Sequence, residues 1–172
     1  MPTTDHQIGG RKVEKDRVQI QESEIAKAVR AEIEGLHAFF VGWFGGKLTN
    51  DDETFSNGFV RRFDPACILI PPGGTIVPLA QLTRMIRSGY GNNPDFRIEI
   101  RNVVLRREER MWVLATYEEW QVNALNSTPP NNARISTAWF RREKATTSGL
   151  AWMHIHECWM PREQVDAGPW DF

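Results

Sequence analysis

Only two cysteines, Cys67 and Cys158, occur among the 172 residues, and no Cys-x-x-Cys spacing is present. Two cysteines cannot build a disulfide framework, so a small disulfide-stabilised secreted fold is excluded. No apolar run approaches the roughly 18 residues that a membrane-spanning helix needs. Residues 1–22 are polar and lack the apolar segment of a signal peptide. We therefore expect a cytoplasmic protein without membrane contact.

Neither sign of charge is in excess, because 21 basic side chains oppose 22 acidic ones. Nucleic-acid-binding domains normally have a basic surface, so we expect no nucleic-acid partner. Three arginine pairs lie near the ends of predicted strands, which is typical of solvated strand ends, with a phosphate site as the alternative. They are Arg61-Arg62, Arg106-Arg107 and Arg141-Arg142.

Aromatic residues, in contrast, are abundant, with seven tryptophans and nine phenylalanines. The length suits one domain with a sizeable core. So many large rings predict a core or a cavity with aromatic walls. The composition gives no reason to expect a metal ion or another cofactor, and we predict none.

A long amphipathic helix is predicted over residues 23–44. Ser23 is a typical N-cap residue, and Gly45-Gly46 ends the helix. Apolar residues recur at steps of three and four, which places them on one helical face: Ile25, Val29, Ile33, Leu36, Phe40 and Trp43. This face should lie against a sheet. Residues 1–21 show no period, and we expect a mobile N-terminal arm there.

Shorter elements follow, and strands dominate the second half of the chain. The predicted segments are a helix at 49–55, a strand at 66–70, a helix at 78–88 with Leu79, Leu82, Met85 and Ile86 inward, and strands at 96–105, 111–123, 133–142 and 150–159. A break in alternation at Asn102-Val103-Val104-Leu105 predicts a β-bulge. Helices followed by long strands are typical of an α+β fold.

This order of elements resembles the nuclear transport factor 2-like superfamily, and within it the SnoaL-like group and the association domain of calcium/calmodulin-dependent kinase II. The stretches that show the resemblance are the helix ending at Gly45-Gly46, Phe63-Asp64-Pro65, the Pro-Gly-Gly turn at 72–74, Trp139-Phe140-Arg141-Arg142, and His154-Ile155-His156-Glu157-Cys158. The last stretch matches the family ending His-x-His-x-Ser, with Cys158 in place of serine.

The resemblance implies a curved antiparallel sheet wrapped around the long N-terminal helix, as in a cystatin-like cone with a central pocket. The domain would span residues 22–161, with a C-terminal tail at 162–172. We expect Phe40, Trp43, Thr137 and Trp139 to line the pocket. Trp112 and Trp120 would lie on the other face of the sheet, and such an apolar patch predicts a homodimer.

Tyr117 and Glu119 share one face of the strand at 111–123, and the resemblance implies that this face lines the pocket. The association domain has an arginine at the position of Glu119. A carboxylate among aromatic rings would be desolvated, which raises its pKa towards values useful in acid/base catalysis. The alternative is that Glu119 lies at a wet rim or pairs with Arg134 or Arg141.

Trp152, His154, His156 and Cys158 alternate along the last strand and should share a face. Either histidine could serve as an acid or a base in the pocket, or both could contact one metal ion, whereas the family-wide His-x-His ending favours a structural role. Asp64, before Pro65, is typical of a turn.

Three functions remain open. The first is a dimeric domain that binds a small apolar ligand. The second is an acid/base enzyme of the isomerase, cyclase or dehydratase type, using Glu119 with Tyr117 or a histidine on an apolar ring-containing substrate. The third is an oligomerisation module, which predicts a filled cavity. Because this superfamily supports all three, fold alone does not choose between them.

Overall fold

The computed structural model describes residues 22–168 and 170–172, so the arm predicted at 1–21 lies outside the described residues. The elements are α1 (Glu24–Phe44), α2 (Asp52–Gly58), a 3-10 turn (Val60–Arg62), β1 (Phe63–Ile70), β2 (Val77–Pro78), α3 (Leu79–Ser88), β3 (Arg97–Glu108), β4 (Trp112–Val122), β5 (Asn132–Arg142), β6 (Leu150–Trp159) and α4 (Arg162–Ala167).

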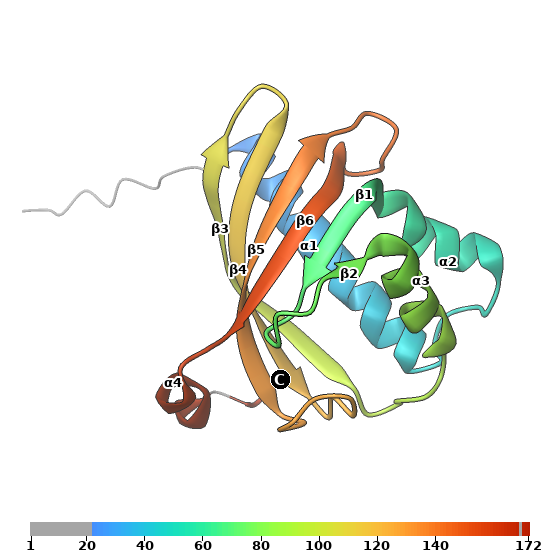
Figure 1. Ribbon diagram of the computed structural model, residues 1–172, viewed down its shortest axis with the longest axis vertical. Helices are drawn as coiled ribbons and strands as arrows, with labels where there is room; N and C mark the ends of the chain where they lie inside the picture. Colours follow the sequence, from blue (N-terminus) through green and yellow to red (C-terminus); the bar gives the residue numbers. More distant parts are fainter. Residues whose placement is uncertain (1–21, 169) are drawn as a thin grey trace, which may run out of the picture.

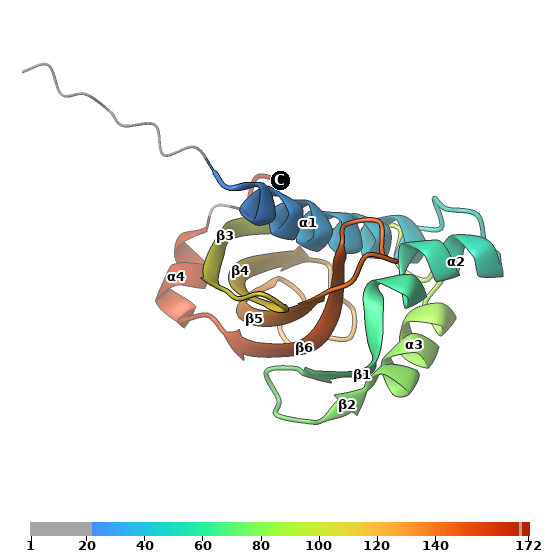
Figure 2. The same ribbon diagram turned by 90° about the horizontal axis from the view of Figure 1, so that it is seen from above.

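The strands form one curved sheet in the order β2-β1-β6-β5-β4-β3 (Figure 1). Strands β3 to β6 are an antiparallel meander, as the sequence predicts. Strand β1 pairs with β6 in parallel, which the sequence did not reveal. Seen from above, the sheet curves so that α1 closes its open side (Figure 2). The predicted α+β fold, with a curved sheet around a long N-terminal helix, is confirmed.

Helix α1 matches its prediction closely. The Ser23 hydroxyl accepts a hydrogen bond from the Ala26 N–H at 3.3 Å and so caps the first turn. The Gly45 N–H donates to the Val41 carbonyl at 3.0 Å at the other end. Val29 and Ile33 are fully buried. The apolar face therefore packs on the concave side of the sheet, where the core lies.

Two helical details differ from prediction. Helix α2 begins at Asp52 rather than near Thr49, because the Asp51 carboxylate accepts a hydrogen bond from the Thr54 N–H at 2.7 Å and caps the helix there. On α3, Leu82 is buried, but Met85 is 55% exposed instead of pointing inward. The predicted tail at 162–172 includes the short helix α4.

The strand register shifts at three places in the meander, one of them between Leu105 and Arg107. The bulge predicted near Asn102 is confirmed, because the β3–β4 register shifts between Arg101 and Val104, and Asn102 has a φ of 50°. Asparagine tolerates this left-handed conformation better than most residues. Another bulge lies at Met153 in β6: Trp139 pairs with His154, but Phe140 pairs with Trp152.

The bulge at Met153 reverses which residues of β6 face the core. Trp152, before the bulge, is fully buried, and its indole N–H donates to Glu32 at 2.9 Å. His156 and Cys158, after the bulge, are exposed on the convex face. The prediction that these residues and His154 share a face with Trp152 is therefore wrong.

Candidate functional site

A cavity of about 180 Å³ lies between α1, α3 and the concave face of the sheet. Most of its wall is apolar, and four phenylalanines provide much of that wall: Phe40, Phe44, Phe63 and Phe96. Phe44 packs edge-on against Phe96 with ring centroids 5.7 Å apart. This inner cavity has the concave, mostly apolar character of a small-molecule pocket.

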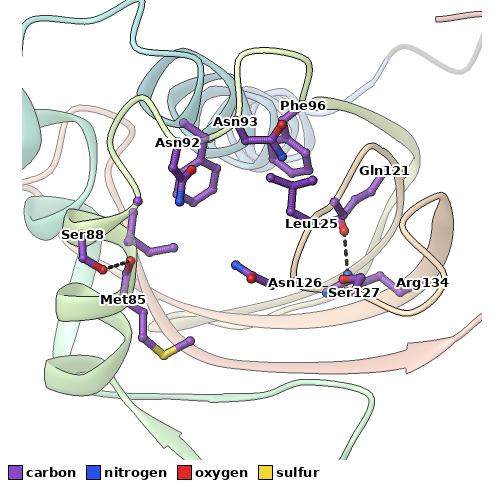
Figure 3. A pocket seen from close by; sticks show the side chains of 14 residues that line it. Met85, Ser88, Asn92, Asn93, Phe96, Gln121, Leu125, Asn126, Ser127 and Arg134 are labelled. Carbon is purple, nitrogen blue, oxygen red and sulfur yellow. Dashed lines mark hydrogen bonds between the residues drawn. The ribbon is translucent and has the colours of Figure 1, made fainter.

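A wider outer compartment of about 430 Å³ adjoins the inner cavity (Figure 3). Asn92, Asn126 and Ser127 give it a polar rim. Five residues line both spaces, and we call them the neck: Phe44, Ile86, Phe96, Gln121 and Arg134. The two spaces therefore lie next to each other, and the neck forms the boundary between them.

One side of the inner cavity is polar. Its members, here called the polar wall, come from α1 and three adjacent strands: His37, Tyr117, Glu119, Gln121, Arg134 and Glu157. Gln121 donates to Glu119 and accepts from the Arg134 Nη2 at 2.8 Å. Hydrogen bonds thus connect every member of the polar wall except Tyr117.

His37 and Glu119 form its first pair. The Nδ1 of His37 lies 2.7 Å from the Ile33 carbonyl oxygen, which can only accept a hydrogen bond. The Nε2 lies 3.1 Å from Glu119 Oε2, so one further proton lies between these two atoms. Whichever group holds that proton, the pair is neutral as a whole.

The pKa of Glu119 moves opposite to the expectation from sequence. Burial alone would raise it, but the charges of His37 and Arg134, with their hydrogen bonds and that of Gln121, lower the pKa to about 2. Burial likewise opposes the charged form of His37, yet the charge of Glu119 raises the His37 pKa. Glu119 is 4% exposed, so it does not lie at a wet rim.

Glu157 is the carboxyl group that is hard to ionise. Burial, followed by the charge of Glu119, raises its pKa to about 7, and Arg134 only partly offsets this. Its Oε2 accepts from the Arg134 Nη1 at 2.8 Å. Among the described residues, none donates a hydrogen bond to its Oε1. Glu157 therefore has a free oxygen in the cavity wall.

Tyr117 stands between these groups on β4. Burial first, and then the charges of Glu119 and Glu157, raise its pKa well above 10. It is 2% exposed, and its ring packs edge-on against His37 at 5.4 Å. The phenol keeps its proton at neutral pH and can donate a hydrogen bond.

Some of the predicted site residues meet in the cavity. Phe40, Tyr117 and Glu119 line the inner cavity together. Trp43 does not line it, because its ring stacks on Phe39 at 5.5 Å and its indole N–H donates to the Ile86 carbonyl at 2.9 Å. Trp43 thus belongs to the packed core, and its prediction as a pocket residue is wrong.

Thr137, Trp139, His154 and His156 face away from the cavity. Along β5 the buried positions are Ser136, Ala138 and Phe140, so the residues between them point to the convex face. Thr137 pairs there with His156, and Trp139 pairs with His154. The predictions that place these four residues in the pocket are wrong.

The sequence analysis missed several polar residues of the site. His37 follows Ile33 by four residues, so it shares the apolar face of α1, and that signal was available. Arg134 was considered only as an alternative partner of Glu119, although it alternates with the small residues Ser136 and Ala138 on β5. The orientation of Glu157 was hidden, because it depends on the bulge at Met153.

The convex face has an apolar patch. Trp112 and Trp139, 36% and 45% exposed, lie 5.2 Å apart, and Ile135 is also exposed on this face. Trp120 was predicted to belong to this patch, but its ring is covered by another side chain. Trp170 covers it at a centroid distance of 5.1 Å, which leaves Trp120 only 3% exposed.

Within residues 22–168 and 170–172, no group of three or more His, Cys, Asp or Glu side chains is placed to hold a metal ion. In the same part of the chain, no helix is both long enough and apolar enough to cross a membrane.

Residues 29–161 match a protein-family model described as sucrose-6-phosphate phosphohydrolase C-terminal. No curated protein sequence matches the chain. Among solved structures, an NTF2-like protein of unknown function from Pseudomonas aeruginosa aligns with a TM-score of 0.66 and 25% identity, over 78% of this chain and 99% of that one.

Two other structures share the fold at lower identity. The calcium/calmodulin-dependent kinase II hub of S. rosetta aligns with a TM-score of 0.61 and 14% identity, over 81% of this chain and 99% of that one. A ketosteroid isomerase-like protein from Erwinia carotovora atroseptica aligns with a TM-score of 0.52 and 13% identity, over 81% of this chain and 99% of that one. The resemblance to the nuclear transport factor 2-like superfamily is confirmed.

Proposed function

This chain belongs to the sucrose-6-phosphate phosphohydrolase C-terminal family, and we propose that it is a small-molecule-binding domain. One observation carries the proposal: an aromatic-walled cavity, adjoined by a wider outer compartment, has a buried network of ionisable side chains on one side. Burying such groups costs free energy, and clusters of perturbed ionisable groups in a cavity are typical of functional sites. A filled cavity, as an oligomerisation module predicts, does not fit this geometry.

The family description names a phosphohydrolase of sucrose 6-phosphate. Among the residues that line the two compartments, the basic ones are His37 and Arg134. Each already faces a carboxylate, at 3.1 Å and 2.8 Å respectively. A phosphate ester would meet paired cations and two carboxylates. We therefore propose binding of a small, partly apolar molecule rather than hydrolysis of a phosphate ester in this cavity.

A thermal-shift screen of small ring compounds tests the proposal, because a bound ligand raises the melting temperature. Ile98→Trp narrows the cavity, since Ile98 lies in its wall on β3. Val104→Trp is the matched control, because Val104 lies on the same strand and is exposed. Ligands should stabilise the wild type and the control but not Ile98→Trp. Equal shifts in all three proteins, or no ligand at all, would contradict the proposal.

A second candidate is an acid/base enzyme, and the raised pKa of Glu157 favours it. A base with a pKa near the working pH is the most effective, so Glu157 suits that role better than Glu119. Tyr117 would donate a hydrogen bond to the substrate oxygen. If a ligand of the screen is turned over, Glu157→Gln should lower the rate about a hundredfold or more. A rate that survives this change would exclude Glu157 as the base.

We also infer that two copies associate through the convex face. The exposed pair Trp112 and Trp139 supports this, since apolar patches on a sheet commonly mark interfaces. The likeness to a kinase hub is consistent with an assembling fold. Light scattering at about 10 μM should give the mass of a dimer, and a monomer would contradict the inference.

A further inference from the structure

We infer that the ligand of the inner cavity carries a positively charged amine, which donates hydrogen bonds to Glu157 Oε1 while its apolar part lies among the phenylalanines. This inference rests on the proposed binding function and names the chemical class of the ligand.

The first observation is that Glu157 uses only one of its two carboxylate oxygens. Arg134 occupies Oε2 at 2.8 Å, and among the described residues no donor reaches Oε1. Glu157 lines the inner cavity and is 7% exposed. Glu157 Oε1 is not among the buried side-chain atoms that lack a partner, so this oxygen remains accessible from the cavity, and a charged donor on a ligand can take the place of water there.

The second observation is that the positive charges of the polar wall are already compensated. His37 and Glu119 are neutral as a pair, because one proton lies between them. Arg134 donates to Glu157, to Gln121 at 2.8 Å and to Asn132 at 3.2 Å. Its Nε has no hydrogen-bond partner among the described residues, but this atom is buried, so a ligand in the cavity does not reach it. An anionic ligand would find no uncompensated cation in the polar wall.

The charges of the polar wall also favour a positively charged ligand. Glu119, Arg134, His37 and Tyr117 are the titratable groups that face Glu157 from β4, β5 and α1. Burial is the largest cause of the raised pKa values of Tyr117 and Glu157, and the charge of Glu119 adds to both; the same charge raises the pKa of His37 against the opposing effect of burial. A cation placed beside Glu157 is therefore attracted.

The apolar part of the cavity also suits an amine. Phe40 and Phe44 stack at 6.0 Å, and Phe44 continues to Phe96 at the neck. Phenylalanine faces attract cations as well as apolar groups. A primary ammonium needs several acceptors or ring faces around it, and Glu157 Oε1 with these rings provides both. A neutral alcohol could also donate a hydrogen bond to Glu157, but it would not gain the attraction between a positive charge and the carboxylate.

Three compounds of one shape separate these cases: benzylamine, benzyl alcohol and benzoate. Isothermal titration at about pH 8, where Glu157 is ionised, should show benzylamine binding at least about tenfold more tightly than benzyl alcohol, because hydrogen bonds to charged groups are the stronger ones. Benzoate should bind most weakly. Glu157→Gln should remove the preference for the amine and leave benzyl alcohol within about twofold of its wild-type affinity.

Glu163→Gln is the matched control, because Glu163 is an exposed residue of α4 outside the cavity. Titrations near pH 6.5 in two buffers of different ionisation enthalpy add a second readout. Benzylamine should release protons, because a cation displaces the proton of Glu157, while benzyl alcohol should not.

Equal binding of benzylamine and benzyl alcohol, unchanged by Glu157→Gln, would overturn the amine inference and leave the binding function in place. Tightest binding of benzoate would also overturn it. If none of the three binds, while the screen with Ile98→Trp succeeds with other compounds, the amine inference fails alone. If the screen fails as well, the proposed function fails with it.

Discussion

Replacing Glu157 by glutamine should stabilise the protein at neutral pH, although it removes an ion pair with Arg134. Burial makes the ionised form of Glu157 unfavourable in the fold, and its pKa is about 7 instead of 4.5. Each tenfold change in acidity corresponds to about 1.4 kcal/mol, so the ionised carboxylate lowers the free energy of unfolding by roughly 3 kcal/mol. Glutamine keeps the size and an oxygen for Arg134.

The pH dependence follows from the same values. A folded pKa above the unfolded one means that the folded state holds the proton more tightly. Stability from this group is therefore complete below about pH 4.5 and is lost as the pH rises towards about 7. Glu157→Gln should differ little from the wild type near pH 4.5, and its advantage should grow to about 3 kcal/mol near pH 7.5.

Urea denaturation at these two pH values measures the effect, with Glu163→Gln as the control. In a chain of this length, 3 kcal/mol corresponds to a rise in melting temperature of roughly 6 to 12 °C. A glutamine variant that is less stable than the wild type near pH 7.5 would refute the reasoning. It would show that the ion pair with Arg134 outweighs the burial of the charge.

Other changes test the packing and the surface. Gly58→Ala should destabilise the protein by about 1–3 kcal/mol in urea, because an added Cβ would lie 2.2 Å from the Phe39 ring; an unchanged midpoint would disprove this close packing. Trp139→Ser should turn the dimer into a monomer in light scattering with little loss of melting temperature, because the side chain is 45% exposed; a dimer that persists would place the interface elsewhere. Cys67 should resist thiol reagents in the folded protein at neutral pH, since burial raises its pKa to about 12; labelling of Cys67 without denaturant would show that this part of the core opens.

The fold could be predicted because its signals are local. The steps of three and four in α1 and the alternation along β3 and β4 each record one buried face. The bulge near Asn102 was predictable for the same reason, since the alternation itself breaks there. The parallel pairing of β1 with β6 is a contact between distant segments, and nothing in either segment records it.

The site was harder to predict, because its chemistry depends on neighbours across strands. The alternation on β4 correctly put Tyr117 and Glu119 together. The direction of the Glu119 pKa was wrong, since it depends on His37 from α1 and Arg134 from β5. The inward orientation of Glu157 could not be predicted, because the bulge at Met153 adds one residue to β6. That extra residue turns His154 and His156 to the convex face and Glu157 to the concave face.

A crystal structure of the protein soaked with benzylamine tests the central claim most directly. The account predicts a ring within the inner cavity, among Phe40, Phe44 and Phe96, and a nitrogen at hydrogen-bond distance, roughly 2.7–3.2 Å, from Glu157 Oε1. A benzylamine bound only on the convex face, or a cavity closed by its own side chains with no ligand inside, would contradict it.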